Sequence, residues 1–251
     1  MTSKSKIESN TSLKDFLREE CITSLAGKHV YFNIDAVRAY LNLQGRKTQG
    51  ATLKSYLSEL TTSSFLYNAG KGWYTFVKEP FKLDLEPVSE LTHLIEKKYP
   101  LLDFSCWSTA QIRAYMHHLL DRFASFVYVE QDAMPSVSEF LRDQGYDVWN
   151  NPRAKTAEGF AIRNRTVVIR RTIKRQPENG HFAPIEKILV DLFIENRSLP
   201  MMELEEYARL FKNISEKERI SIGTFLSYAK ECNLTGKDFR KALEFTISDN
   251  L

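Results

Sequence analysis

Three kinds of feature are scarce in this sequence of 251 residues, and each scarcity excludes a class of protein. Cysteine occurs only at Cys21, Cys106 and Cys232, so we expect neither a disulfide framework nor a CxxC metal site. No apolar run approaches the roughly 18 residues that a membrane-spanning helix needs. The opening MTSKSKIESN also lacks the apolar centre of a secretory signal. We therefore expect a cytoplasmic protein that makes no contact with a membrane.

Loops that cradle nucleotides are also missing, because the sequence contains neither a Walker-type nor a GxGxxG motif. The whole chain is 43% hydrophobic, 12% aromatic and 27% charged, which is the composition of a chain that folds around a core. We expect no cofactor, and we expect a binding protein in preference to an enzyme.

Charge is unevenly distributed along the chain, although the net charge is only +3. The net charge is +4 for residues 1–80, −5 for 81–152, +7 for 153–175 and −3 for 176–251. The basic segment 153–175 admits two interpretations. Its arginines contact nucleic-acid phosphates, or they lie on an exposed hairpin and pair with the carboxylates of 81–152. The sequence leaves both open.

The N-terminal third begins with three predicted helices and one short strand. Ser12 and Asp15 have the spacing of a capping box, which predicts the start of a helix. The aromatic and β-branched run 29–32 predicts a strand, and Asn33 or Asp35 is the predicted cap of the second helix. A third helix is predicted from about residue 50 to residue 63, with its leucines on one side.

A β-hairpin is predicted directly after the third helix, from the segments SFLYNA and GWYTFVK. Gly70 and Gly72 permit a tight turn, and Lys71 lies at its tip. The order helix, strand, helix, helix, hairpin is that of a winged helix-turn-helix, a DNA-binding arrangement. We therefore predict such a domain at residues 11–80.

The third helix is the predicted recognition helix, because the side opposite its leucines carries small and hydroxyl-bearing residues. Cations at its start and at the hairpin tip would neutralise phosphates, and polar side chains would reach base edges. The residues predicted to contact double-stranded DNA are Arg46, Lys47, Thr48, Gln49, Thr52, Lys54, Ser55 and Lys71. Since one winged helix supplies little affinity, we expect a homodimer on paired half-sites. The alternative is a protein-interaction adaptor.

A second region follows the segment 81–90, which contains Pro87 and is a predicted linker. Strand patterns separated by single helical patterns predict a small, partly parallel βαβ sheet. From Ala183 onward the pattern is helical and predicts a bundle. The predicted fold class is thus α+β: an N-terminal winged helix-turn-helix, then an α/β domain at 91–251 with a C-terminal helical bundle.

Three segments together resemble a known family: GKGWYTFVK in the hairpin, CWSTAQIRAYMHHLLDRFASFVYVEQD in the middle and PIEKILVDLFIEN near the end. They are similar to the AbiEi-type antitoxins and predicted viral-defence transcriptional regulators. The resemblance implies binding to the protein's own promoter, with Lys47, Thr48 and Gln49, together with Ser55 and Lys71, in the DNA-contacting parts. It also implies a role in a toxin-antitoxin or phage-defence operon and a cognate nucleotidyltransferase-type toxin. The sequence departs from the family in the insert GKHVYFN and in a long connection before the third helix.

An enzymatic alternative depends on Glu130 and Asp132, which lie two positions apart near the end of a predicted strand. Side chains two apart in a strand point to the same face, so this pair would hold a metal ion for chemistry on a nucleic acid or nucleotide. The sequence lacks the further motifs that a nucleotidyltransferase or a metal-dependent nuclease would carry.

Overall fold

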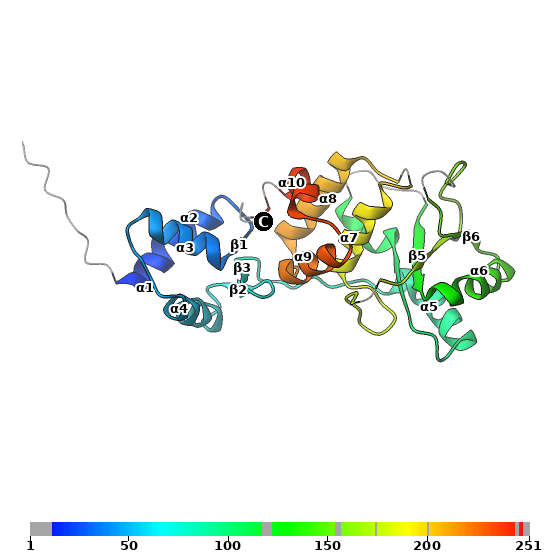
Figure 1. The fold of residues 1–251 in the computed structure, drawn as a ribbon, viewed down its shortest axis with the longest axis horizontal. Helices are drawn as coiled ribbons and strands as arrows, with labels where there is room; N and C mark the ends of the chain where they lie inside the picture. Colours follow the sequence, from blue (N-terminus) through cyan, green and yellow to red (C-terminus); the bar gives the residue numbers. More distant parts are fainter. Residues whose placement is uncertain are drawn as a thin grey trace, which may run out of the picture.

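The structure is a computed structural model, and its shape is elongated (Figure 1). The N-terminal helices form one end, a four-stranded sheet with two helices forms the other, and the C-terminal helices lie between them. The fold is α+β, as predicted. The described residues are 12–116, 122–153, 157–173, 175–199, 201–243 and 246–247, without the side chains of 240–242.

The N-terminal end has the predicted order of elements. Ser12 caps the first helix by accepting a hydrogen bond from the Asp15 amide, and Asn33 caps the third by accepting one from Ala36. The three strands pair antiparallel in the order β1–β3–β2, as in a winged helix. The elements are α1 (Leu13–Phe16), the π-helical η1 (Leu17–Cys21), α2 (Ile22–Ala26), β1 (Tyr31–Asn33), α3 (Ile34–Leu43), α4 (Gly50–Thr62), β2 (Tyr67–Asn68) and β3 (Trp73–Thr75).

The other end is a mixed sheet in the order β4–β5–β7–β6. β5 and β6 both pair in parallel with β7, whereas β4 pairs antiparallel with β5, so the predicted partly parallel sheet is confirmed. The elements are α5 (Glu86–Lys98), β4 (Phe104–Ser108), the 3-10 helix η2 (Thr109–Tyr115), β5 (Ala124–Val129), the 3-10 helix η3 (Gln131–Ala133), α6 (Met134–Asp143), β6 (Asp147–Asn150) and β7 (Thr166–Arg171).

Two predicted boundaries in this region were wrong. Residues 86–90 of the predicted linker form the start of α5, because Pro87 sits in the first turn of a helix, where its missing N–H costs nothing. The helix predicted from residue 109 is a 3-10 helix that ends at Tyr115. The rest of that prediction, at 117–121, falls outside the described residues.

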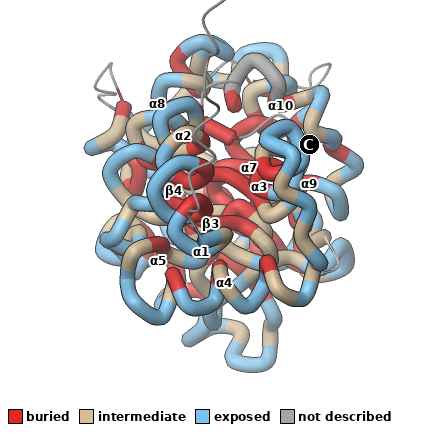
Figure 2. Tube along the Cα trace, turned by 90° about the vertical axis from the view of Figure 1, so that its left-hand side faces the viewer, coloured by how far each residue is buried: buried red, intermediate tan, exposed pale blue. Residues whose placement is uncertain are grey.

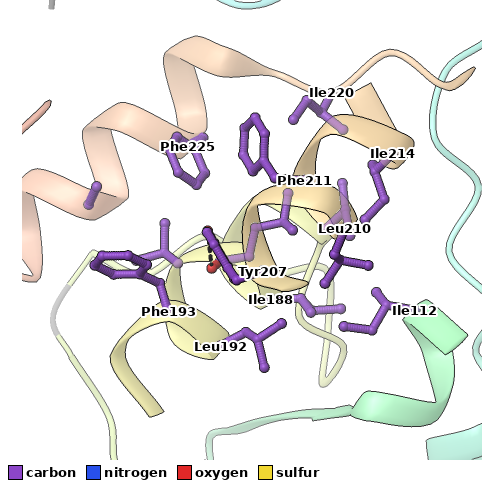
Figure 3. Close-up of a cluster of buried hydrophobic side chains, with 14 of the residues drawn as sticks. Ile112, Ile188, Leu192, Phe193, Tyr207, Leu210, Phe211, Ile214, Ile220 and Phe225 are labelled. Carbon is purple, nitrogen blue, oxygen red and sulfur yellow. Dashed lines mark hydrogen bonds between the residues drawn. The ribbon is translucent and has the colours of Figure 1, made fainter. Parts of the chain in front are cut away.

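Four helices make up the C-terminal part: α7 (Ile185–Glu195), α8 (Leu204–Lys217), α9 (Ile222–Glu231) and α10 (Gly236–Leu243). Their core is rich in aromatic side chains, and Phe193, Phe211 and Phe225 are 6%, 0% and 0% exposed (Figure 3). Tyr207 is fully buried beside them, and its hydroxyl donates to the Leu189 carbonyl at 2.9 Å. Each such side chain contributes about 2 kcal/mol of hydrophobic stabilisation.

The small sheet and the C-terminal helices share one core. Tyr31 and Trp73 belong to the same buried cluster as the residues of α7–α10, whereas the N-terminal helices have a cluster of their own. The Tyr31 hydroxyl accepts a hydrogen bond from the Ile220 amide at 3.1 Å. The Tyr31 amide donates to the Thr246 carbonyl at 2.9 Å, so residues 246–247 lie beside β1. The winged helix is therefore fastened to the C-terminal helices.

The two faces of the mixed sheet contribute to different cores. Phe126 and Tyr128 of β5 pack with the C-terminal helices, and the alternate residues Val127 and Val129 pack with α5 and α6. This division follows from the two-residue period of a strand. Within the described part of the chain, no helix is long and apolar enough to serve as a membrane span.

Candidate nucleic-acid interface

Helix α4 buries one side and leaves the other open. Leu53, Leu57 and Leu60 are 0%, 0% and 4% exposed and pack into the N-terminal cluster. Viewed from this end of the molecule, exposed residues surround the α1 and α4 labels and buried residues gather towards the centre (Figure 2). The residues opposite the leucines are all exposed: Ala51, Lys54, Ser55, Ser58 and Thr62. The predicted reading face is therefore accessible to a duplex.

The connection before α4 adds positive charge at the start of the helix. Lys47 and Gln49 are exposed, and the Arg46 guanidinium lies 4.2 Å from the centre of the Phe16 ring. Gln49 occupies the N-cap position of α4 without making a side-chain capping bond to any described residue. The first N–H groups of α4 are thus free of side-chain caps, and such groups attract anions. Thr48 and Thr52 are half-buried.

Sequence reasoning missed Arg38, which lies on the preceding helix α3. A terminal nitrogen of Arg38 is 3.8 Å from the position that a Cβ on Gly50 would occupy, so this cation stands at the start of α4. Arg38 also pairs with Asp35 at 2.6 Å, one turn earlier. Its exposed place on the helix before the recognition helix was the signal that could have identified it.

The opposite end of α4 is electrically neutral. Glu59 is the acidic residue of this helix, and it pairs with Lys14 from α1. Its hydrogen bond and its charge raise the pKa of Lys14, so Lys14 keeps its positive charge beside Glu59. Because Glu59 is neutralised, the reading face keeps the positive character that Lys54 and the preceding connection give it.

Lys71 lies in a turn that packs against α9. Gly70 has a φ of +102°, and a Cβ there would come within 2.7 Å of the Gly223 amide nitrogen. That amide donates to the Ala69 carbonyl at 3.3 Å. The predicted glycine turn is confirmed, and its glycines also permit the close approach to α9. The Lys71 side chain is exposed, and its contact with DNA stays a prediction.

Most arginines of the basic segment 153–175 are paired with carboxylates. Arg165 bonds Glu90 at 2.9 Å, and Arg163 lies 3.9 Å from Asp147, both acids of the segment 81–152. Two others pair with C-terminal helices: Arg170 with Glu195, and Arg175 with Glu231 at 3.7 Å. This pairing favours the structural interpretation of the segment over a second nucleic-acid surface.

A buried network of ionisable groups lies at α7, and sequence reasoning missed it. Lys187 and Asp191 are 0% and 1% exposed and pair at 2.6 Å. Tyr228 donates to Asp191 at 2.8 Å, and the Lys187 ammonium lies 3.6 Å from the centre of the Tyr128 ring. The spacing of four between Lys187, Asp191 and Glu195, in a helix that is apolar at its other positions except Glu186, was the available signal, because it places all three on one side.

Glu130 and Asp132 do not have the predicted geometry. β5 ends at Val129, and Asp132 lies in the 3-10 helix η3, so the alternation argument was wrong because the strand is shorter than expected. Both side chains are exposed. Among the described residues, no three His, Cys, Asp or Glu side chains gather closely enough to hold a metal ion.

The chain belongs to a family of unknown function, DUF6577, whose profile matches residues 52–246. The matched region begins inside α4 and runs through the mixed sheet and the C-terminal helices. The connection at 46–49 lies before it. None of the curated proteins matches the sequence.

Proposed function

We propose that this protein is a DNA-binding transcriptional regulator that reads double-stranded DNA with the exposed face of α4. The observation that carries the proposal is the open face of small residues on α4, flanked at its start by Lys47 and Lys54. A helix with small outward side chains fits the major groove, and cations at its start meet the phosphates.

The proposal extends to autoregulation of the protein's own promoter in a toxin-antitoxin or phage-defence operon. Its support is the resemblance of the hairpin, middle and α7 segments to the AbiEi-type antitoxins. In that case the mixed sheet and the C-terminal helices are the part that meets a cognate toxin. A nucleotidyltransferase-like gene next to this one, whose product co-purifies with the protein, is the expected finding.

We also propose that the protein binds DNA as a homodimer, because one recognition helix contacts too few base pairs for a specific site. The expected operator is a pair of half-sites about 34–36 Å apart, which corresponds to one turn of the duplex. Footprinting of the promoter would show two protected half-sites.

The test is a gel-shift assay on the protein's own promoter fragment. Changing Lys47, Lys54 and Lys71 together to alanine should abolish the shift and flatten its salt dependence, because each lost phosphate contact lowers the slope of log K against log salt by about 1. A matched control is Lys97→Ala, since Lys97 is an exposed lysine on α5 at the other end of the molecule.

Single variants then divide the effect among the three lysines. Lys47→Ala and Lys54→Ala should each weaken binding, and Lys71→Ala measures what the turn beside α9 contributes. Binding of the triple variant equal to that of Lys97→Ala would end the proposal.

A further inference from the structure

A cavity of about 460 Å³ lies where the chain leaves the winged helix and meets the C-terminal helices. Residues from the segment 80–85, which follows β3, form part of its lining, and residues 182–186, which lead into α7, form another part. Asn68 of β2 and residues 219–221, between α8 and α9, also line it. Ligand cavities occur preferentially at such junctions, and their usual volumes are roughly 300–1,000 Å³.

Most of the lining is apolar, and much of it is open to solvent. Phe81, Leu83 and Phe182 are half-buried, and Leu85 is 40% exposed, although each has a large hydrophobic side chain. Apolar surface that faces water is stabilised when an apolar group covers it. The lining therefore favours a ligand with an apolar body.

One carboxylate, that of Glu186, lies in this lining without a cationic partner. Its Oε1 accepts from the Ser221 amide at 2.6 Å, and no Lys, Arg or His of the described residues pairs with it. Burial raises the pKa of this carboxyl, and the opposing contributions come from the backbone amides of Ser221 and of Glu186 itself. Because a carboxylate that is partly removed from water is stabilised by a counter-ion, a cation in the cavity would have a partner.

The cation that lines the cavity, Arg219, is held by other groups. Its guanidinium donates to the carbonyls of Val77 and Lys78 at 3.4 Å and 2.8 Å. It also lies 5.0 Å from the centre of the Tyr67 ring, and it does not lower the pKa of Glu186. Arg219 therefore fastens the chain that follows β3 and leaves the charge of Glu186 uncompensated.

We propose that this cavity binds a small organic ammonium ion with an apolar body. The ammonium group donates to the Glu186 carboxylate, and the apolar body covers Phe81, Leu83 and Phe182. An amine that carries one aromatic ring on a short alkyl chain has this chemistry. None of the residues predicted to contact DNA lines the cavity, so this proposal and the DNA-binding proposal can fail separately.

The test is isothermal titration calorimetry of the full chain at pH 7 with phenethylamine, phenethyl alcohol and hydrocinnamate. These probes share an aromatic body, and they are cationic, neutral and anionic. We expect phenethylamine to bind at least about tenfold more tightly than phenethyl alcohol, because a charge-assisted hydrogen bond is gained. Hydrocinnamate should bind most weakly, because its charge has the same sign as that of Glu186.

Glu186→Gln separates the charge of this side chain from its contact with Ser221. The variant keeps an amide oxygen that can accept from the Ser221 N–H, and it removes the negative charge. It should bind phenethylamine and phenethyl alcohol about equally. Leu85→Ser removes apolar lining, so it should weaken the binding of both probes by a similar factor, about threefold.

The matched control is Glu178→Gln, because Glu178 is an exposed carboxylate that precedes the lining residue Asn179 but does not line the cavity itself. This variant should keep the wild-type preference for phenethylamine. An equal loss of preference in Glu178→Gln and Glu186→Gln would mean that only general charge is felt, and the proposal would fail. It would also fail if no probe bound the wild type, if hydrocinnamate bound as tightly as phenethylamine, or if Glu186→Gln kept the preference.

Discussion

The molecule has two groups of cations, and they differ in how their charge is compensated. The arginines of 153–175 give the higher net charge, yet four of those described pair with a carboxylate. The cations at the start of α4 belong to a segment of lower net charge, but Lys47 and Lys54 are exposed beside an open helix face. Net charge along a sequence is therefore a poor guide to an interface, because it does not say which charges have partners.

The largest expected difference is in the free energy of unfolding of two variants that each remove one paired arginine. Arg170→Ala leaves Glu195, which is 3% exposed, without its partner, and we expect a loss of about 3–5 kcal/mol in the free energy of unfolding. Arg165→Ala breaks an exposed pair with Glu90 and should cost at most about 1 kcal/mol. Urea denaturation of both variants measures the difference.

A double variant separates pairing from packing in this comparison. Changing Arg170 to Met and Glu195 to Leu together removes both charges and keeps apolar volume, so it should recover much of the stability that Arg170→Ala loses. Equal stability of Arg170→Ala and Arg165→Ala would contradict the view that one pair is structural and the other incidental.

The turn that carries Lys71 should depend on a glycine of α9. A Cβ at Gly223 would lie 2.9 Å from the Lys71 amide nitrogen, so Gly223→Ala should lower the free energy of unfolding by about 1–3 kcal/mol. Gly27→Ala is the control, because a Cβ there meets its nearest atom at an ordinary 3.5 Å. Thermal unfolding of the two variants compares them, and a Gly223→Ala protein as stable as Gly27→Ala would show that the turn is not held against α9.

Glu186 is a half-buried carboxylate that accepts a hydrogen bond from the Ser221 amide at 2.6 Å, and it predicts the smallest effect. Burial raises its pKa above the usual 4.5. The folded state therefore holds this proton more tightly than the unfolded state, and the stabilisation is lost as the pH rises through the folded pKa. Glu186→Gln removes this loss.

The measurement is urea denaturation of wild type and Glu186→Gln between pH 4 and pH 7. The unfolding free energy of the variant, relative to wild type, should increase as the pH rises across this interval. A difference that stays constant or decreases with pH would contradict a raised pKa for Glu186.

The sequence predicts local features of this fold well. Caps at Ser12 and Asn33, the leucine side of α4 and the glycine turn depend on neighbouring residues, so they can be read from the chain. The docking of that turn against Gly223 joins residues about 150 positions apart, and no local pattern encodes it. β5 ends earlier than predicted, so Glu130 and Asp132 lie outside the strand. Where this strand ends likewise depends on tertiary packing.

The candidate sites divide in the same way. The residues at 46–55 were predicted because a helix-turn-helix has a recognisable order, whereas Arg38 was missed because its closeness to Gly50 depends on how two helices cross. The cavity beside Glu186 was also missed. It combines the segment after β3 with the start of α7 and the connection before α9, and these segments come together only in the folded chain.

The central claim is that the open face of α4 contacts DNA, and a charge placed on that face tests it most directly. Ser55→Glu adds a carboxylate at an exposed position of α4, and Ser89→Glu makes the same change at an exposed position of α5. By fluorescence anisotropy with the promoter fragment, Ser55→Glu should weaken binding about 100-fold or more, because the new charge faces phosphates. Ser89→Glu should bind like the wild type, and equal affinities of the two variants would contradict the account.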